Sequence, residues 1–111
     1  MATISNLYVD AGSTYTNIIT VSSSNGAPLN LTDYTVASQM RKSYQSSIAY
    51  PFTASVYNAL NGKIRLQLTD EQSELIPPGR YLYDVEITSP IGITTRVVEG
   101  IVTVNPQITK V

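Results

Sequence analysis

The clearest pattern in the chain is a two-residue alternation of apolar and polar side chains from Lys63 to Leu68. Ile64, Leu66 and Leu68 share one face, and the polar residues between them share the other. A period of two is typical of a β-strand with one buried face. The stretch 81–87 alternates in the same way and predicts a second strand, whose inward set is Tyr81, Tyr83, Val85 and Ile87.

Between these two strands the sequence predicts one short helical turn near 69–75. Thr69 is the expected N-cap, because its hydroxyl can accept from the Gln72 amide while the Gln72 side chain reaches back to Thr69. The tripeptide Pro77-Pro78-Gly79 then stops the helix, and Gly79 supplies the permissive backbone of a tight turn.

Five further stretches predict short strands separated by turns. These strands are expected at 3–9, 14–21, 34–42, 48–57 and 93–104, with turn signals at Asn25-Gly26, Asn61-Gly62 and Ser89-Pro90-Ile91-Gly92. Pro51 predicts that its strand is interrupted, bulged or at a sheet edge. In the last strand the alternation changes phase, and we expect a bulge at Gly100. In 14–21 the inward face stays open, because Ile18 and Ile19 point opposite ways.

About seven short strands, with turns roughly every ten residues, are typical of a β-sandwich. The sequence therefore predicts an all-β, antiparallel immunoglobulin-like β-sandwich with a single short helical turn. A chain of 111 residues is long enough for one such core, so we expect a single domain over 1–111.

The composition restricts the chemistry of the chain. It has no cysteine and no histidine, so disulfides, thiolate zinc sites and the commonest general base are excluded. The formal net charge is −1 and the basic residues are scattered, which does not favour nucleic acid or an anionic membrane as a partner. No apolar run approaches the roughly 20 residues of a membrane span, and no signal peptide is recognisable. We therefore expect no enzyme activity, no cofactor and no metal.

Two groups of carboxylates are candidates for chemistry: Asp70, Glu71 and Glu74 in the helical turn, and Asp84 and Glu86 on one strand face. Paired carboxylates serve glycoside hydrolysis, and oxygen clusters bind hard cations. Helix capping and ordinary solvation explain the first group better. The second group is expected to face solvent, with Lys63 or Arg65 as available cross-strand partners.

One run resembles the beginning of strand F in immunoglobulin-like domains. Leu75 and Gly79-Arg80-Tyr81-Leu82-Tyr83-Asp84-Val85 follow that pattern, with Tyr81 at the tyrosine-corner position. The resemblance implies that the Tyr81 hydroxyl bonds an upstream backbone group. Tyr83 stands where antibody domains have cysteine, and the usual tryptophan is missing, which argues against a true antibody-type domain.

Most of the chain is similar to a family of small immunoglobulin-like modules in the virions of tailed bacteriophages. The motifs that carry this similarity are Asn25-Gly26-Ala27-Pro28-Leu29-Asn30-Leu31-Thr32, Gly62-Lys63-Ile64-Arg65-Leu66, Leu68-Thr69-Asp70-Glu71-Gln72, Pro78-Gly79-Arg80-Tyr81-Leu82-Tyr83-Asp84-Val85 and Gly100-Ile101-Val102-Thr103-Val104. The resemblance implies a virion structural protein, in capsid decoration or as a tail or baseplate accessory. It implies synthesis in the host cytoplasm and partners that are other virion proteins, with self-association as a further option. It supplies no catalytic residue.

The segment 48–57 and the N-terminal segment are the candidate contact regions, because both resemble sheet edges and carry aromatic residues. We expect Tyr50, Phe52 and Tyr57 to form a protein interface, because burial of aromatic side chains dominates many such contacts. The alternative function is a carbohydrate-binding or adhesion module on the same scaffold. That alternative predicts a shallow groove with two or more coplanar aromatic rings.

Overall fold

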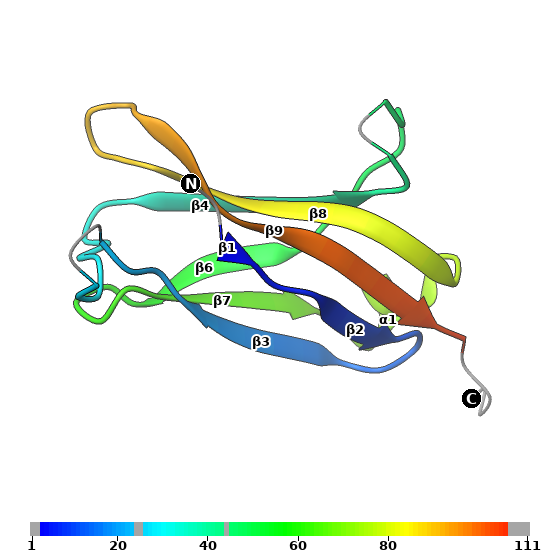
Figure 1. Ribbon diagram of the computed structural model, residues 1–111. Helices are drawn as coiled ribbons and strands as arrows, with labels where there is room; N and C mark the ends of the chain where they lie inside the picture. The colour runs from blue at the N-terminus through cyan, green and yellow to red at the C-terminus, as the bar shows by residue number, and fades with distance from the viewer. Residues whose placement is uncertain (1–2, 24–25, 44, 107–111) are drawn as a thin grey trace.

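The computed structural model describes residues 3–23, 26–43 and 45–106, which form two β-sheets packed face to face (Figure 1). The six-stranded sheet has the order β1-β9-β8-β4-β5, with β2 also paired to β9, and the three-stranded sheet has the order β3-β7-β6. The elements are β1 (Thr3–Ile4), β2 (Leu7–Asp10), β3 (Tyr15–Thr20), β4 (Thr35–Arg41), β5 (Tyr50–Pro51), β6 (Thr53–Asn58), β7 (Lys63–Leu68), α1 (Asp70–Glu74), β8 (Gly79–Thr88) and β9 (Thr94–Asn105).

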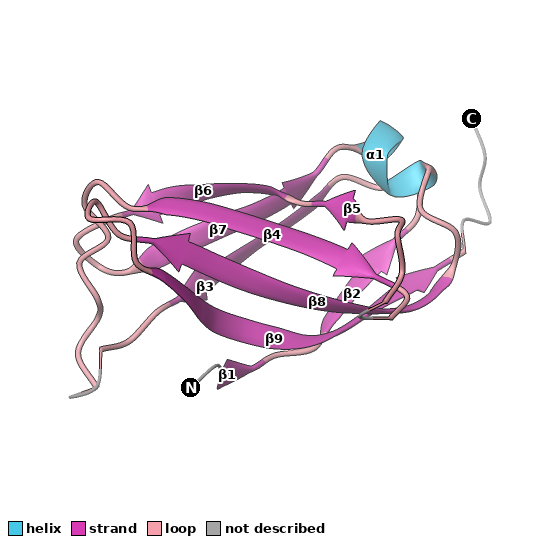
Figure 2. Ribbon diagram, turned by 90° about the horizontal axis from the view of Figure 1, so that it is seen from above, coloured by secondary structure: helices cyan, strands magenta, loops and turns pink. Residues whose placement is uncertain are grey.

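The predicted all-β sandwich with one short helix is confirmed. β1 and β2 are two pieces of the first predicted strand, and β5 and β6 are two pieces of the fifth, so the labelled strands correspond to the seven expected ones. The ladders are antiparallel except those of β1 and β2, which run parallel to β9. The helix lies at one end of the sandwich (Figure 2), and no helix in the described ranges is long and apolar enough to cross a membrane.

The core lies between the sheets and is built from the inward positions of the predicted alternation. In β7 the inward residues Ile64, Leu66 and Leu68 are fully buried, as are Val85 of β8 and Val102 of β9. Burial of these side chains supplies the main driving force for folding. The structure also shows which face of the 14–21 segment is directed inward: Ile19 packs against the core, while Ile18 faces solvent.

The proline in 48–57 marks the point where the chain changes sheets. β5, which ends at Pro51, pairs with β4 of the six-stranded sheet, whereas β6 pairs with β7 of the three-stranded sheet. Phe52 stands between them, and its N–H donates to the Ser38 carbonyl over 3.0 Å. The predicted interruption is confirmed, and its consequence is that Phe52 points into the core.

The capping box predicted for the helix is present with both of its hydrogen bonds. The Thr69 hydroxyl accepts from the Gln72 amide over 3.1 Å, and the Gln72 side chain accepts from the Thr69 amide over 2.8 Å. The buried Ser73 hydroxyl accepts from the Gly12 amide over 3.0 Å and donates to the Ser13 carbonyl over 2.8 Å. The helix is therefore tied to the turn between β2 and β3.

The bulge expected at Gly100 lies elsewhere. Gly100 pairs regularly with Tyr83, and the register of β8 and β9 shifts between Val85 and Glu86, where Val97 is the extra residue. The physical reason is that Val98 is already in phase with Val102, so the alternation changes three residues earlier than predicted. A Cβ on Gly100 would lie 2.1 Å from the Ser5 carbonyl oxygen, so glycine is needed there for close packing of the chain.

The two tyrosines predicted to define the fold are buried and hydrogen bonded to backbone. The Tyr81 hydroxyl donates to the Pro77 carbonyl, which is the predicted tyrosine corner. The Tyr83 hydroxyl donates to the Ser5 carbonyl over 2.6 Å and so ties β8 to the segment between β1 and β2. Gly79 has φ +143°, which confirms its predicted turn role. Gly26 also has positive φ, while Asn25 lies outside the described residues.

Burial of Tyr83 predicts that stability falls as the pH rises from about 10 to about 12. Burial raises the pKa of the Tyr83 hydroxyl from 10.0 to about 12, so the folded chain keeps a proton that the unfolded chain releases above pH 10. Below that window both states hold the proton and the group adds no pH dependence. Inside that window the free energy of unfolding declines by up to about 1.4 kcal/mol per pH unit, because the unfolded state binds fewer protons than the folded state.

The variant Tyr83→Phe tests this pH dependence. It loses the hydrogen bond to Ser5, so we expect its free energy of unfolding to be about 1 kcal/mol lower near neutral pH. Between about pH 10 and 12 its decline should be shallower than that of the parent chain, because one titrating group is gone. Urea unfolding at several pH values measures both effects, and equal slopes in the two chains would contradict the assignment.

Candidate binding surface

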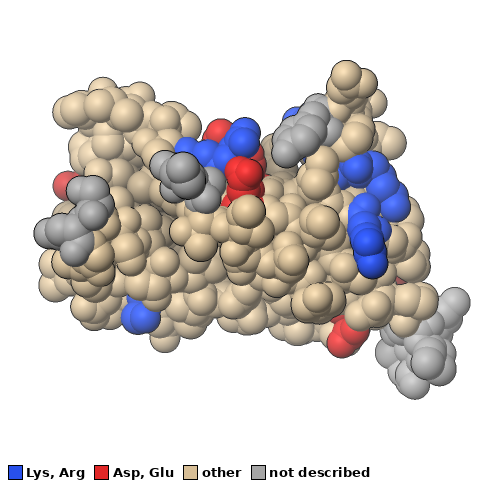
Figure 3. Space-filling model, viewed as in Figure 1, with Lys and Arg blue, Asp and Glu red and all other residues tan. Residues whose placement is uncertain are grey.

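A trough runs across the outer face of the six-stranded sheet, between two loops that rise from opposite ends of that sheet. One wall is the turn between β8 and β9, and the other is the link between β4 and β5 (Figure 1). The hollow between the walls is visible in Figure 3 and has a volume of about 350 Å³. Its lining residues are Ala37, Ser38, Gln39, Arg41, Ser43, Leu82, Tyr83, Asp84, Glu86, Arg96 and Glu99.

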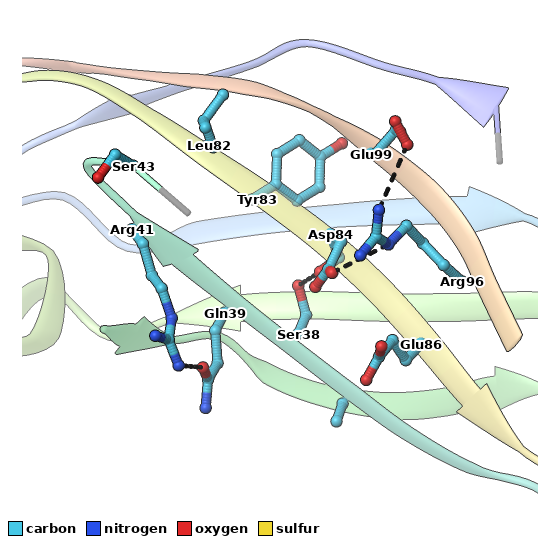
Figure 4. Close-up of a pocket in the computed structure, with 11 residues that line it drawn as sticks. Ser38, Gln39, Arg41, Ser43, Leu82, Tyr83, Asp84, Glu86, Arg96 and Glu99 are labelled. Carbon is cyan, nitrogen blue, oxygen red and sulfur yellow. Dashed lines mark hydrogen bonds and ion pairs between the residues drawn. The ribbon is translucent and has the colours of Figure 1, made fainter. Parts of the chain in front are cut away.

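The charged floor of the trough centres on Arg96 (Figure 4). Its Nε lies 3.2 Å from Asp84 Oδ2, and its Nη1 lies 3.8 Å from Glu99 Oε2. The bulge at Val97 creates this cluster, because the shifted register pairs Arg96 with Glu86 and keeps Glu99 opposite Asp84. The charged side chains are therefore brought together by the register between β8 and β9, which cannot be read from the sequence alone.

The ion pairs of the floor are accessible to a partner. The side chains of Arg96, Asp84 and Glu99 are each between about a third and a half exposed. Exposed ion pairs of this kind contribute about 0–1 kcal/mol, so their exchange for contacts with another molecule costs little. The predicted cross-strand pairing of Asp84 and Glu86 with Lys63 or Arg65 is wrong, because Lys63 and Arg65 lie on β7 in the other sheet.

The rest of the floor is held in place by hydrogen bonds. The Arg41 guanidinium donates from Nη1 to the Ser46 carbonyl over 2.9 Å and from Nη2 to Gln39 Oε1 over 3.3 Å. The bond from Arg41 to Ser46 joins β4 to the β4–β5 link, which is one wall of the trough. The buried Ser38 hydroxyl donates to the Asp84 carbonyl over 2.6 Å and fixes β4 against β8. The trough is therefore a preorganised polar surface.

The two walls carry exposed aliphatic side chains. Ile91 is 82% exposed and Ile93 is also exposed in the β8–β9 turn, and Ile48 is exposed in the opposite wall. The lining of the trough does not include these three side chains, and Ile91 and Ile93 line a second hollow of about 420 Å³ together with Tyr34 and Ile87. Sequence reasoning treated 89–92 only as a turn. The available signal was two isoleucines on either side of Gly92, in a turn too short to return them to the core. Exposed apolar side chains beside a hollow are typical of contact sites.

The three aromatic residues proposed as an interface do not share a surface. Phe52 is only 5% exposed, and its ring centroid lies 6.0 Å from that of Tyr15 and 6.1 Å from that of Tyr83. Its assignment as a contact residue is wrong, because the change of sheet after Pro51 turns it inward. Tyr50 is half-buried edge-on against Tyr81 at 5.8 Å, whereas Tyr57 is exposed on the three-stranded sheet.

The remaining ionisable groups with shifted pKa values are buried tyrosines. Burial raises the pKa of Tyr15 and of Tyr81, as it does for Tyr83. All three pack in or against the core, so the shifts follow from folding. Among the described residues no cluster of three or more His, Cys, Asp or Glu side chains is placed to hold a metal ion.

Comparison with known proteins shows the fold. No family model and no curated protein sequence matches the chain. Among solved structures, it is similar to an internalin-like protein of Listeria monocytogenes, with a TM-score of 0.50 and 17% identity over 94% of this chain and 28% of that one. A family 123 glycoside hydrolase of Clostridium perfringens aligns with a TM-score of 0.44 and 12% identity over 96% of this chain and 23% of that one. The chain thus spans about a quarter of each of these two structures. We conclude that it is an all-β sandwich, a fold that it shares with one part of the internalin-like protein.

Proposed function

We propose that this chain is a structural module of a bacteriophage particle that acts through protein–protein contacts, in capsid decoration or as a tail or baseplate accessory. The sequence resemblance to virion modules is the reason for proposing that the chain belongs to a phage particle. The observation that supports a contact role is the trough, with paired charges on its floor, flanked by two loops that carry exposed isoleucines. A ridge or loop of a neighbouring virion protein is the partner that fits such a hollow.

The walls would supply most of the affinity and the floor most of the specificity. Burial of one exposed isoleucine contributes about 1.5–3 kcal/mol, which exceeds the contribution of an exposed ion pair. The Arg96 cluster, with charges of both signs, would orient a partner that presents complementary groups. Many symmetric copies on a particle would add avidity to a modest single contact.

The variant Ile91→Ser should weaken binding to purified particles that lack the chain by about 10- to 100-fold. This corresponds to the lost burial of one large aliphatic side chain. The copy number bound per particle, measured by quantitative mass spectrometry at limiting protein, gives the effect. The matched control is Leu75→Ser, because Leu75 is 76% exposed but lies after α1, away from the trough.

The outcomes of this experiment separate the alternatives. Loss for Ile91→Ser with retention for Leu75→Ser supports the β8–β9 wall of the trough as part of the contact surface. Equal binding by all three chains would refute that placement, and absence of binding to any particle would refute the virion role. Glycan-array binding without particle binding would favour the carbohydrate module, although the exposed Tyr8 and Tyr57 lie in different sheets and form no common platform.

A further inference from the structure

The outer edge of β3 is not paired with any strand in the described part of the chain. In the three-stranded sheet, β3 lies beside β7 and on the outside (Figure 1). The Val21 amide donates to the Gly62 carbonyl, which fixes the phase of the ladder. The odd residues of β3 therefore bond to β7, and the N–H and C=O groups of Thr16, Ile18 and Thr20 point outward.

The other sheet edges carry features that hinder strand addition, and β3 does not. β5 is two residues long and ends in Pro51, and the β1–β2 edge is interrupted between Ile4 and Leu7. β6 is bulged between Val56 and Asn58. β3 has six residues, a regular register and neither proline nor a charged side chain. Natural proteins usually protect edges by such features, so an unprotected edge indicates a pairing surface.

The inward face of β3 is also less covered than that of its neighbour. Tyr15, Asn17 and Ile19 are only half-buried, while the inward residues of β7 are fully buried. On the outer face, Ile18 is 43% exposed. A strand added beside β3 would cover both sets of side chains.

We propose that β3 pairs antiparallel with β3 of a second copy of this chain, with Ile18 opposite Ile18. In this register Thr16 lies opposite Thr20 of the partner copy, and all three outward-pointing residues are used. Three hydrogen-bonded pairs give about six backbone hydrogen bonds. The two three-stranded sheets then form one continuous sheet across the dimer.

The charge distribution favours a second copy as the occupant. β3 is uncharged, so two copies meet without like charges in the new ladder. Two cations of β7 lie near β3: Lys63 donates from Nζ to Thr20 Oγ1 over 3.2 Å, and Arg65 is opposite Ile18. In the proposed register Thr20 and its symmetry mate are offset by four residues, roughly 13 Å, along the ladder, and three strand spacings, roughly 14 Å, separate Arg65 from its mate. Both separations exceed the Debye length of about 8 Å at physiological salt. The cross-strand Ile18 and threonine pairs are of the kind that stabilises sheets.

Sedimentation equilibrium over about 1 to 500 µM protein tests the dimer, since a small edge interface is expected to have a micromolar dissociation constant. We expect the parent chain to dimerise. Ile18→Glu should remain monomeric, because like charges would lie directly opposite each other, while Arg65 accommodates the glutamate in the monomer. Ile101→Glu is the matched control, since Ile101 is 38% exposed on β9, away from β3. A parent chain that stays monomeric, or an Ile18→Glu dimer, overturns the proposal.

A cysteine cross-link tests the register. The chain has no cysteine, so Ile18→Cys introduces a unique thiol. In a hydrogen-bonded antiparallel pair the Cα atoms are about 5.5 Å apart, which a disulfide can bridge. Mild oxidation should convert Ile18→Cys to a covalent dimer much faster than Ile101→Cys. Equal rates would overturn this register. Both tests use the isolated chain, so their outcome is independent of whether it belongs to a particle.

Discussion

Phe52→Ala should lower the free energy of unfolding by about 3–5 kcal/mol. The Phe52 ring fills the space between Tyr15 and Tyr83 at the point where the chain crosses between the sheets. Its removal leaves a cavity whose rim is held by strands of both sheets, so the structure cannot collapse to fill it. Stabilities of whole domains are about 5–15 kcal/mol, so this loss is a large fraction of the total. Denaturant unfolding at equilibrium measures it.

Tyr57→Ala provides the contrast for Phe52. Tyr57 is 54% exposed, and its main contact is the Arg65 guanidinium 5.4 Å from the ring centroid. An exposed cation–π contact contributes about 0.5–1 kcal/mol, so the change in stability should stay below about 1 kcal/mol. Similar losses for the two variants would contradict the placement of Phe52 in the core. A joint substitution of Tyr50, Phe52 and Tyr57 would include the loss of core packing at Phe52, so reduced docking by that variant could not be assigned to the exposed surface.

Gly100→Ala should lower the free energy of unfolding by about 2–4 kcal/mol. An added Cβ would lie 2.1 Å from the Ser5 carbonyl oxygen and 2.8 Å from its carbon, and backbone atoms cannot swing aside as a flexible side chain can. Overpacking of this kind typically costs about 1–3 kcal/mol. The displaced segment would also weaken the hydrogen bond from Tyr83 to Ser5, with a further cost of about 1 kcal/mol.

Hydrogen exchange locates the damage that Gly100→Ala is expected to cause. The Ser5 amide donates to the Glu99 carbonyl over 2.9 Å, and this bond should lose protection together with the parallel ladder of β2 on β9. Amides of β7 should change less. Gly92→Ala is the control, because a Cβ there meets nothing within 4 Å and only its φ of +91° is unfavourable. If Gly92→Ala were the more destabilising of the two, close packing at Gly100 would not be the cause.

Local features of the candidate site were predictable, and the site itself was not. The outward position of Asp84 follows from alternation in 81–87, because each strand residue points opposite to its neighbours. The position of Arg96 depends on where the last strand is bulged, and packing of Val98 into the core places that bulge at Val97. The walls of the trough depend on how two loops rise from the sheet, which no local pattern in the sequence encodes.

Local sequence patterns specify the strands of strong alternation and the capped turn at Thr69, and the resemblance to strand F of immunoglobulin-like domains implies the tyrosine corner at Tyr81. Each is fixed by interactions among residues a few positions apart, so their signals are present in short windows of the sequence. Long-range packing buries Phe52, pairs β2 with β9 and leaves β3 at an edge of its sheet. These features depend on contacts between segments far apart in the chain, such as Leu7 beside Val102, and burial selects among the pairings that local propensities permit.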